Sequence, residues 1–386
     1  MNHVVKNNAL NKHMMQKINR LKMLEIIRRA PISRVSIAEK TGLSLATVTN
    51  VVSFLIEENL VIETGTEETE KIGRKAVVLE FNPSFYELVC VKLDTNKFTI
   101  ALTDLGGVIK LSVTKDVITL SDPESVTVAL KDALDVFFES IDHTKVLAVG
   151  IGVSGLVLDN EKLLLSTSLK WNSIDLKHEI QEHINKPVII ENITATNALF
   201  IYNKLKSEEE KNVIYIEMEN GIGAAQIYNG DINNAVIGEI GHTTVERNGD
   251  LCFCGNKGCL EVMCSVDRMI SLAAKDNLNP PTSIDDVFCA VKTDQRIRRT
   301  VDRCGEYLGF SIANIINIFN PQKIIINSIQ YNNSDHIHSR IIKCVKQRVN
   351  KVLLENLTFE RANISEEEKI AGIAKCLTNT VFDLIW

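Results

Sequence analysis

The chain has 386 residues, which is long enough for two or three domains that each bury a core. It has no run of about 18 apolar residues and no apolar signal-peptide core near its N-terminus, so we expect a cytoplasmic protein without a membrane-spanning helix. Nine cysteines in such a chain indicate reduced thiols and metal ligands rather than disulfides.

The net charge of −6 is distributed unevenly along the chain. Residues 1–62 contain nine Lys and Arg against four Asp and Glu, a charge of +5, which leaves −11 for the remainder. A basic N-terminal segment on an acidic body suggests a head that binds an anion such as nucleic acid.

The N-terminal segment has the pattern of a helix-turn-helix. Apolar periodicity predicts an amphipathic helix over residues 17–29, and a short helix is expected over 36–40. A tight turn at Gly42 follows, and Ser44 supplies a hydroxyl cap to a third helix that runs to about residue 58. The apolar positions expected to be buried are Ile18, Leu21, Met23 or Leu24, Ile27, Val48, Val51 or Val52, and Leu55.

Small polar side chains near the start of the third helix point away from its apolar stripe, as in a helix that enters a DNA major groove. Asn50 is suited to reading adenine. Residues 60–63 and 73–79 predict a two-stranded wing, with Arg74 entering a minor groove. The alternative is a winged module that binds protein. The residues expected to contact DNA are Ser44, Thr47, Thr49, Asn50, Arg74 and Lys75.

After Pro83 the pattern becomes that of an α/β body. Strands are predicted at 88–93, 98–102, 108–113, 146–153, 188–191, 213–218, 224–228 and 323–326, with a helix at 123–140 and mainly helices after 260. Strand meanders followed by βα units occur twice, which predicts two α/β lobes with a ligand cleft between them. The expected domains are 1–82, 83–195 and 196–386, with C-terminal helices that can return to the first lobe.

One histidine and three cysteines form the pattern His-x9-Cys-x-Cys-x4-Cys. Thiolates with one imidazole make a tetrahedral set that suits a structural Zn²⁺, without an open position for a catalytic water. The alternative is a group of unrelated reduced cysteines. Glu239 and Glu261 bracket the pattern and can hold a polyol by charge-assisted hydrogen bonds, or else support the metal ligands. The expected ligands are His242, Cys252, Cys254 and Cys259.

The motifs Gly238–His242 and Cys252–Glu261, together with the head pattern and residues 308–321, resemble the ROK family (repressors, open reading frames and kinases) over essentially the whole chain. The resemblance is closest to the repressors related to xylose, N-acetylglucosamine and glucose. It implies an α/β body of two actin-like (ribonuclease H-like) lobes behind an N-terminal all-α winged helix-turn-helix domain. It also implies that sugar hydroxyls are bound by Glu191, Asn192, Glu239, His242 and Glu261.

Three features that the resemblance implies for a sugar kinase are missing. The phosphate-binding glycine turn is replaced by residues 94–98, and residues 326–329 lack the late glycine pair. The position of the catalytic aspartate is Ile193, or Asn192 if the register shifts by one, and neither side chain can act as a base.

We therefore expect a protein that is not an enzyme but a sugar-responsive repressor of carbohydrate metabolism. It would bind palindromic operator DNA as a homodimer or homotetramer and respond to a monosaccharide. Two alternatives remain: the same regulator sensing a protein, such as a transporter subunit, or a phosphorylated sugar; and an active ATP-dependent sugar kinase.

Overall fold

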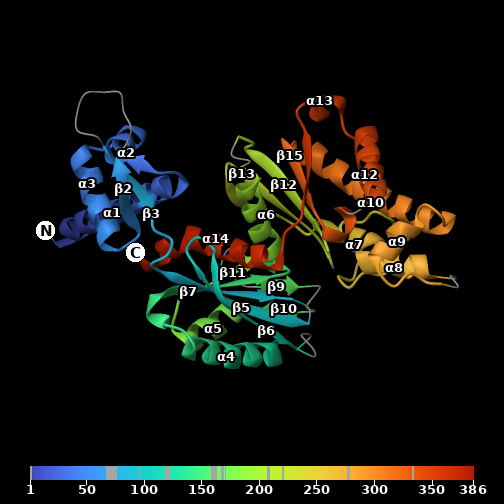
Figure 1. Ribbon diagram of the computed structural model, residues 1–386, viewed down its shortest axis with the longest axis horizontal. Coiled ribbons are helices and arrows are strands. Elements are labelled where there is room, and N and C mark those ends of the chain that lie inside the picture. Colours follow the sequence, from blue (N-terminus) through green and yellow to red (C-terminus); the bar gives the residue numbers. More distant parts are fainter. Residues whose placement is uncertain are drawn as a thin grey trace.

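The computed structural model describes residues 2–66, 76–94, 96–117, 122–157, 163–166, 169, 171–206, 209–219, 221–275, 279–332 and 334–386. Figure 1 shows a small N-terminal head (blue) and two α/β lobes, with the C-terminal helix (red) lying between the lobes and ending near the head. Within the described residues, no helix combines the length and the hydropathy needed to cross a membrane.

The head is a helix-turn-helix with a small sheet beside it. Its elements are α1 (Asn2–Arg29), β1 (Ile32–Ser33), α2 (Arg34–Thr41), α3 (Leu45–Glu57), β2 (Val61–Thr66) and β3 (Val77–Phe81), with sheet order β1-β3-β2. Ser44 caps α3 by accepting the backbone N–H of Thr47 at 3.2 Å. Gly42 ends α2 at φ +72°, a left-handed conformation that glycine adopts without strain.

The first lobe is built on a five-stranded sheet. Its elements are β4 (Glu87–Leu93), β5 (Lys97–Asp104), β6 (Ile109–Asp116), α4 (Pro123–Glu139), η1 (His143–Lys145), β7 (Val146–Val153), β8 (Leu156–Val157), β9 (Leu163–Ser166), β10 (Trp171–Ile174), α5 (Leu176–Ile184) and β11 (Val188–Asn192). The sheet order is β11-β7-β4-β5-β6, with β4, β7 and β11 parallel to one another. Helices α4 and α5 cover one face through an apolar cluster that includes Leu130 and Ile180.

The second lobe repeats the plan with sheet order β14-β13-β12-β15-β16. Its elements are α6 (Ile193–Lys204), β12 (Asn212–Met218), β13 (Ile222–Tyr228), β14 (Asp231–Gly238), η2 (Ile240–His242), α7 (Leu260–Cys264), α8 (Val266–Ala274), α9 (Ile284–Ala290), α10 (Gln295–Phe319), β15 (Lys323–Asn327), α11 (Ile329–Asn332), α12 (Asp335–Arg348), α13 (Lys351–Leu354) and β16 (Thr358–Ala362). Because side chains alternate along a strand, Ile324 and Ile326 face α10, whereas Ile325 faces α6.

The C-terminal helix α14 (Glu366–Ile385) joins all three parts of the molecule. It packs on β4 and β7 of the first lobe and against α6. Most of its buried apolar residues share one apolar cluster with the core of the head. Trp386 meets the ring of Phe54 in α3 edge to face, with 5.6 Å between ring centroids. Arg28 of α1 donates hydrogen bonds to Thr378 O (3.2 Å) and Asn379 Oδ1 (2.7 Å). The head is therefore packed on the body.

The strands and helices predicted for the body are confirmed, with ends that differ by a few residues. The strands that the sequence did not reveal are β1, β8, β9, β10, β14 and β16. Several of these are only two to four residues long, too short for a period-two pattern to emerge. The C-terminal helix does return to the first lobe, where it covers the sheet face opposite α4.

The head differs in detail from expectation. Helix α1 begins at Asn2 rather than near residue 17, and Ile18 is 47% exposed instead of buried. Met23 and Leu24 are both buried, and Val52 rather than Val51 completes the stripe of α3. The expected two-stranded wing is a three-stranded sheet, because β1 pairs with β3. Arg74 and Lys75 lie outside the described residues.

Because the head and first lobe share a core, loss of packing in α14 should destabilise both. Leu377 is 1% exposed and belongs to that shared cluster. We predict that Leu377→Ala lowers the free energy of unfolding by about 2–5 kcal/mol, measured by urea denaturation with circular dichroism and tryptophan fluorescence. Leu384 of the same helix is 50% exposed, so Leu384→Ala should change stability by less than about 0.5 kcal/mol. Equal transition midpoints for the two variants would contradict the shared core.

Candidate functional site

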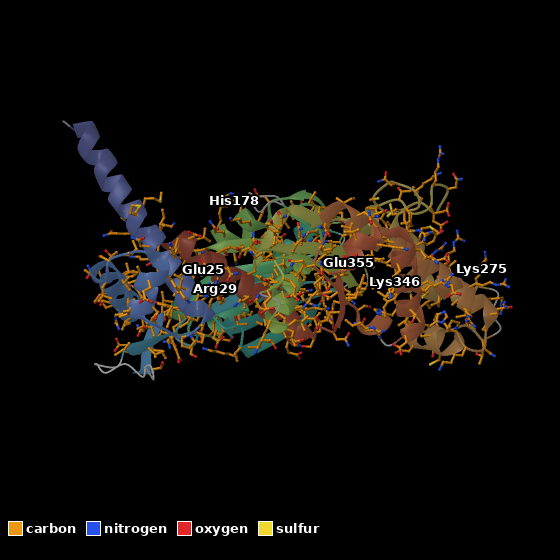
Figure 2. The ribbon with its side chains drawn as sticks, turned by 90° about the horizontal axis from the view of Figure 1, so that it is seen from above. Glu25, Arg29, His178, Lys275, Lys346 and Glu355 are labelled. Carbon is orange, nitrogen blue, oxygen red and sulfur yellow. The ribbon has the colours of Figure 1, made fainter. Side chains whose placement is uncertain are left out.

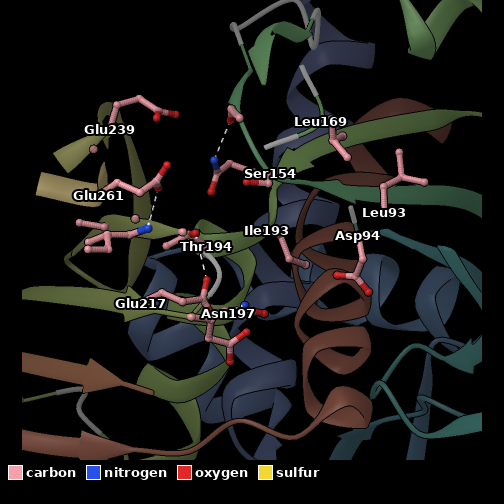
Figure 3. A pocket seen from close by; sticks show the side chains of 18 of the residues that line it. Leu93, Asp94, Ser154, Leu169, Ile193, Thr194, Asn197, Glu217, Glu239 and Glu261 are labelled. Carbon is pink, nitrogen blue, oxygen red and sulfur yellow. Dashed lines mark hydrogen bonds between the residues drawn. The ribbon is translucent and has the colours of Figure 1, made fainter. Parts of the chain in front are cut away.

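A pocket of about 140 Å³ lies between the two lobes. It is lined by the carboxyl ends of β4, β11 and β12, by the start of α14, and by η2 and α7. The carboxyl ends of parallel strands are the usual ligand-binding edge of an open α/β sheet. In Figure 3, Glu239 and Glu261 lie on one wall with Glu217 below them, and Leu93 and Asp94 lie on the opposite wall. Both lobes therefore contribute to one site.

The wall with Glu239 and Glu261 belongs to the second lobe. Glu261 Oε2 accepts the backbone N–H of Ile222 at 2.9 Å. A Cβ on Gly241 would lie 2.4 Å from the carbonyl oxygen of Ile222, so only glycine allows η2 to approach β13 this closely. His242 Nε2 lies 3.6 Å from Glu239 Oε2. Burial raises the pKa of Glu239. This wall offers hydrogen-bond acceptors that suit a polyhydroxylated ligand.

Four of the five expected sugar residues line the pocket: Asn192, Glu239, His242 and Glu261. The Asn192 side chain also stabilises the local fold by two hydrogen bonds. Its Nδ2 donates to Gly155 O at 2.7 Å, and its Oδ1 caps α6 by accepting the N–H of Ala195 at 3.1 Å. Glu191 is not among the described lining residues, contrary to expectation, because neighbours on a strand point to opposite faces.

The sequence did not reveal the buried charges at the junction of the lobes. Lys369 at the start of α14 donates to Glu219 Oε2 (2.7 Å) and to Glu366 Oε1 (2.9 Å). Lys92 at the end of β4 is paired with Asp94 (2.9 Å) and with Glu366. Burial would raise the pKa of Glu366, but hydrogen bonds from the two lysines outweigh it and lower this pKa to about 2. The network ties α14 to a strand of each lobe.

Glu217, at the end of β12, is a second feature that the sequence did not reveal. Its carboxylate accepts hydrogen bonds from Thr194 (3.0 Å), Asn197 (3.0 Å) and Tyr215 (3.2 Å). Burial, and then the charge of Glu219, raise the pKa of Glu217. In the sequence, Lys92 and Glu217 each appear as a single charged residue near the end of an apolar strand. Until the two lobes are placed together, this pattern cannot be distinguished from an ordinary charged residue at the protein surface.

The four expected metal ligands converge beside the acidic wall. All four ligand atoms lie within 4.8 Å of one another. The Nδ1 atom of His242 is 3.5 Å from Cys252 Sγ, and Cys254 Sγ is 3.6 Å from Cys259 Sγ. Gly258 has φ +67°, and a Cβ there would lie 1.6 Å from the Glu246 carbonyl oxygen. The two ring nitrogens of His242 thus face two different groups, the thiols and Glu239.

The expected DNA-reading side chains lie at the start of α3. Ser44 and Thr47 are hydrogen-bonded to each other at 2.9 Å, and Thr49 Oγ1 donates to Leu45 O at 2.8 Å. Asn50 is exposed, and its side chain makes no hydrogen bond with the part of the chain that the structure describes. Its amide is therefore available to a partner outside the protein.

Known proteins resemble both the head and the body. The ROK family model matches residues 88–379, and a model for winged helix-turn-helix DNA-binding domains matches residues 17–62. The chain is 31% identical over 377 residues to the xylose repressor of Bacillus spizizenii, covering 96% of this chain and 97% of that protein.

Two solved structures show the same architecture. A ROK family transcriptional regulator, a homologue of the E. coli MLC protein, matches with a TM-score of 0.81 at 26% identity, over 96% of this chain and 98% of that chain. A ROK glucokinase from Streptomyces griseus, solved with glucose and AMPPNP, matches with a TM-score of 0.62 at 20% identity, over 75% of this chain and 98% of that chain; this likeness concerns the fold alone. With a family model that spans most of its length and a relative that matches it nearly end to end, the chain belongs to the ROK family.

Proposed function

We propose that this protein is a transcriptional repressor that releases its operator when a monosaccharide binds between its lobes. The observation that carries the proposal is the course of α14. Its first turn contributes Lys369 to the pocket, and its end places Trp386 against Phe54 of α3, the helix with the DNA-reading face. One rigid element therefore connects the ligand site to the DNA-binding helix.

The charge of the pocket favours an uncharged sugar. Its described lining carries five carboxylates against two lysines, Lys92 and Lys369, and both lysines are already paired with acids. A phosphorylated sugar would bring a further negative charge into this acidic site, which favours the neutral ligand over the phosphorylated one. The volume of about 140 Å³ is below the ~300–1,000 Å³ of pockets for drug-sized molecules, which suits a single sugar ring.

The same residues argue against phosphoryl transfer. Ile193 and Asn192, the two expected positions of the catalytic base, both line the pocket, and neither side chain can act as a base. Asp94 is held by Lys92, and Glu217 accepts three hydrogen bonds from α6 and β12. We infer that the body binds a sugar without transferring phosphate to it.

Ligand binding can reach the head only if one arrangement of the lobes binds the sugar better than another. The ion pair between Lys369 and Glu219 joins α14 to the segment directly after β12 of the second lobe, so a change in lobe closure would act on α14. In a dimer, a small rotation of α14 alters the separation of the two recognition helices, which must match two operator half-sites.

We infer that the four-ligand cluster holds a structural zinc ion. Zinc in a tetrahedral site lies ~2.3 Å from sulfur and ~2.0 Å from nitrogen, so ligand atoms within 4.8 Å of one another suit it. His242, Cys252, Cys254 and Cys259 would hold the ion, whose contribution is to fix the loop. Because His242 also lines the pocket, the metal cluster would fix the orientation of its imidazole ring in the sugar site.

The function is tested by fluorescence anisotropy on DNA from the region upstream of the protein's own gene. We predict tight binding that is lost on addition of D-xylose, D-glucose or N-acetyl-D-glucosamine. Asn50→Ala should weaken binding to that DNA by about 1–3 kcal/mol and leave binding to unrelated DNA unchanged, since the amide reads a base edge. Tight binding that ignores every sugar would instead favour a protein effector.

The acidic wall should determine sugar affinity. In Glu261→Gln, the amide oxygen can still accept the Ile222 N–H, but the charge that strengthens a hydrogen bond to a sugar hydroxyl is lost. We predict that the affinity for the releasing sugar, D-xylose in the first titration, falls about tenfold by calorimetry. Glu355→Gln, on an exposed residue outside the pocket, is the matched control. Equal affinities in the two variants would remove Glu261 from the ligand site.

Removal of one thiol should abolish metal binding and the sugar response together. We predict that Cys254→Ser purifies with less than a tenth of the wild-type zinc, measured by mass spectrometry of the metal, and no longer releases DNA with sugar. Cys289, an exposed cysteine outside the cluster, gives the control variant Cys289→Ser, which should keep both properties. Full zinc content in Cys254→Ser would refute the ligand assignment.

A further inference from the structure

A second hollow, of about 710 Å³, lies where the head meets the body. One side is formed by α1, another by α14, and a third by the end of α6 and the turn between β13 and β14. Glu25 and Arg29, labelled in Figure 2 where α1 meets the body, lie at its edge. The hollow is therefore lined by the head, by the C-terminal helix and by the second lobe.

Two half-buried cations line this hollow, Arg28 from α1 and Lys375 from α14. Arg28 is held by Thr378 O and Asn379 Oδ1, and its guanidinium lies 5.5 Å from the ring centroid of Phe81. The Lys375 side chain has no hydrogen bond or ion pair within the described residues. A half-buried ammonium without a partner is less well solvated than a fully exposed one, so a neutralising partner would stabilise it.

The acids of the hollow do not supply that partner. Glu25 is paired with Arg29, and Asp231 and Asp383 are exposed to solvent. The pKa values reflect this arrangement. Burial lowers the pKa of Arg28 to about 10, and burial followed by the charge of Arg28 lowers the pKa of Lys375. Arg28 and Lys375 therefore repel each other, and both line the same hollow.

We propose that this hollow binds a small polyvalent anion, a phosphate or the phosphate group of a metabolite, between Lys375 and Arg28. Lys375 supplies a flexible ammonium without a competing partner, and Arg28 supplies a positive charge already fixed in place. The acidic pocket between the lobes disfavours a negatively charged ligand, whereas the hollow at the head offers two cations to one. The two sites would therefore bind chemically different ligands.

An anion at this position would act on the contact between head and body. Arg28 belongs to the head and is bonded to α14 at Thr378 and Asn379, about one turn beyond Lys375. A ligand held by both cations would relieve their repulsion where the two parts meet, and would stabilise the docked head.

The test is thermal unfolding of the full-length protein with inorganic phosphate, against sodium chloride at equal ionic strength. We expect phosphate to raise the melting temperature of the wild type. Lys375→Met should weaken the apparent phosphate affinity at least about tenfold. Lys375→Arg, which keeps the charge, should retain the response. Lys346→Met is the control on an exposed lysine of α12, which Figure 2 shows far from Glu25 and Arg29.

A further readout separates loss of the site from misfolding. Without polyvalent anions, Lys375→Met should be at least as stable as the wild type, because it removes a half-buried unpaired charge. The proposal is overturned if phosphate stabilises the wild type no more than chloride does, or if Lys375→Met responds to phosphate as the wild type does. Sugar titrations of the same variants report on the pocket between the lobes separately, so either site can fail without the other.

Discussion

The arrangement of this protein depends on the packing of one helix at both of its ends. Helix α14 has 20 residues, a length of roughly 30 Å at about 1.5 Å per residue. Its first turn is held by the ion pairs of Lys369 with Glu219 and of Glu366 with Lys92, one to each lobe, and its last turn is held by aromatic packing against α3. Close-packed interiors shift between discrete arrangements instead of deforming smoothly. In the proposed mechanism, the helix moves as a unit and carries a local change between the lobes to the head.

The electrostatics of the site follow from the same arrangement. Lys92, Glu366, Lys369 and Glu219 form a chain of alternating charge that crosses from one lobe to the other. Partly buried ion pairs of this kind add little net stability, but removal of one partner leaves a poorly solvated charge without compensation.

Much of this molecule is predictable from its sequence, for physical reasons that can be named. The caps at Ser44 and Gly42 and the regular stripe of α3 specify the helix-turn-helix, because these signals are local. The cluster of His242 with three cysteines is also local, and the structure brings all four together.

The parts that were not predictable depend on contacts between distant segments. Lys92 and Lys369 acquire their role only when α14 returns to the first lobe. Glu191 and Asn192 are neighbours in the chain, yet only Asn192 lines the pocket, because alternation along β11 separates them. The hollow around Lys375 likewise exists only where three separate segments meet.

The buried position of the lysine network has a consequence for how this protein behaves as ionic strength changes. Salt screens exposed charges over roughly 8 Å at physiological concentration, whereas buried pairs are screened much less. Binding to DNA phosphates weakens steeply with salt, because counterions are released. Binding to DNA would therefore vary with the ionic strength inside the cell, while the ion pair that joins α14 to the second lobe, between Lys369 (8% exposed) and Glu219 (26% exposed), would change less. The protein would then keep its response to the ligand at ionic strengths that change its affinity for DNA.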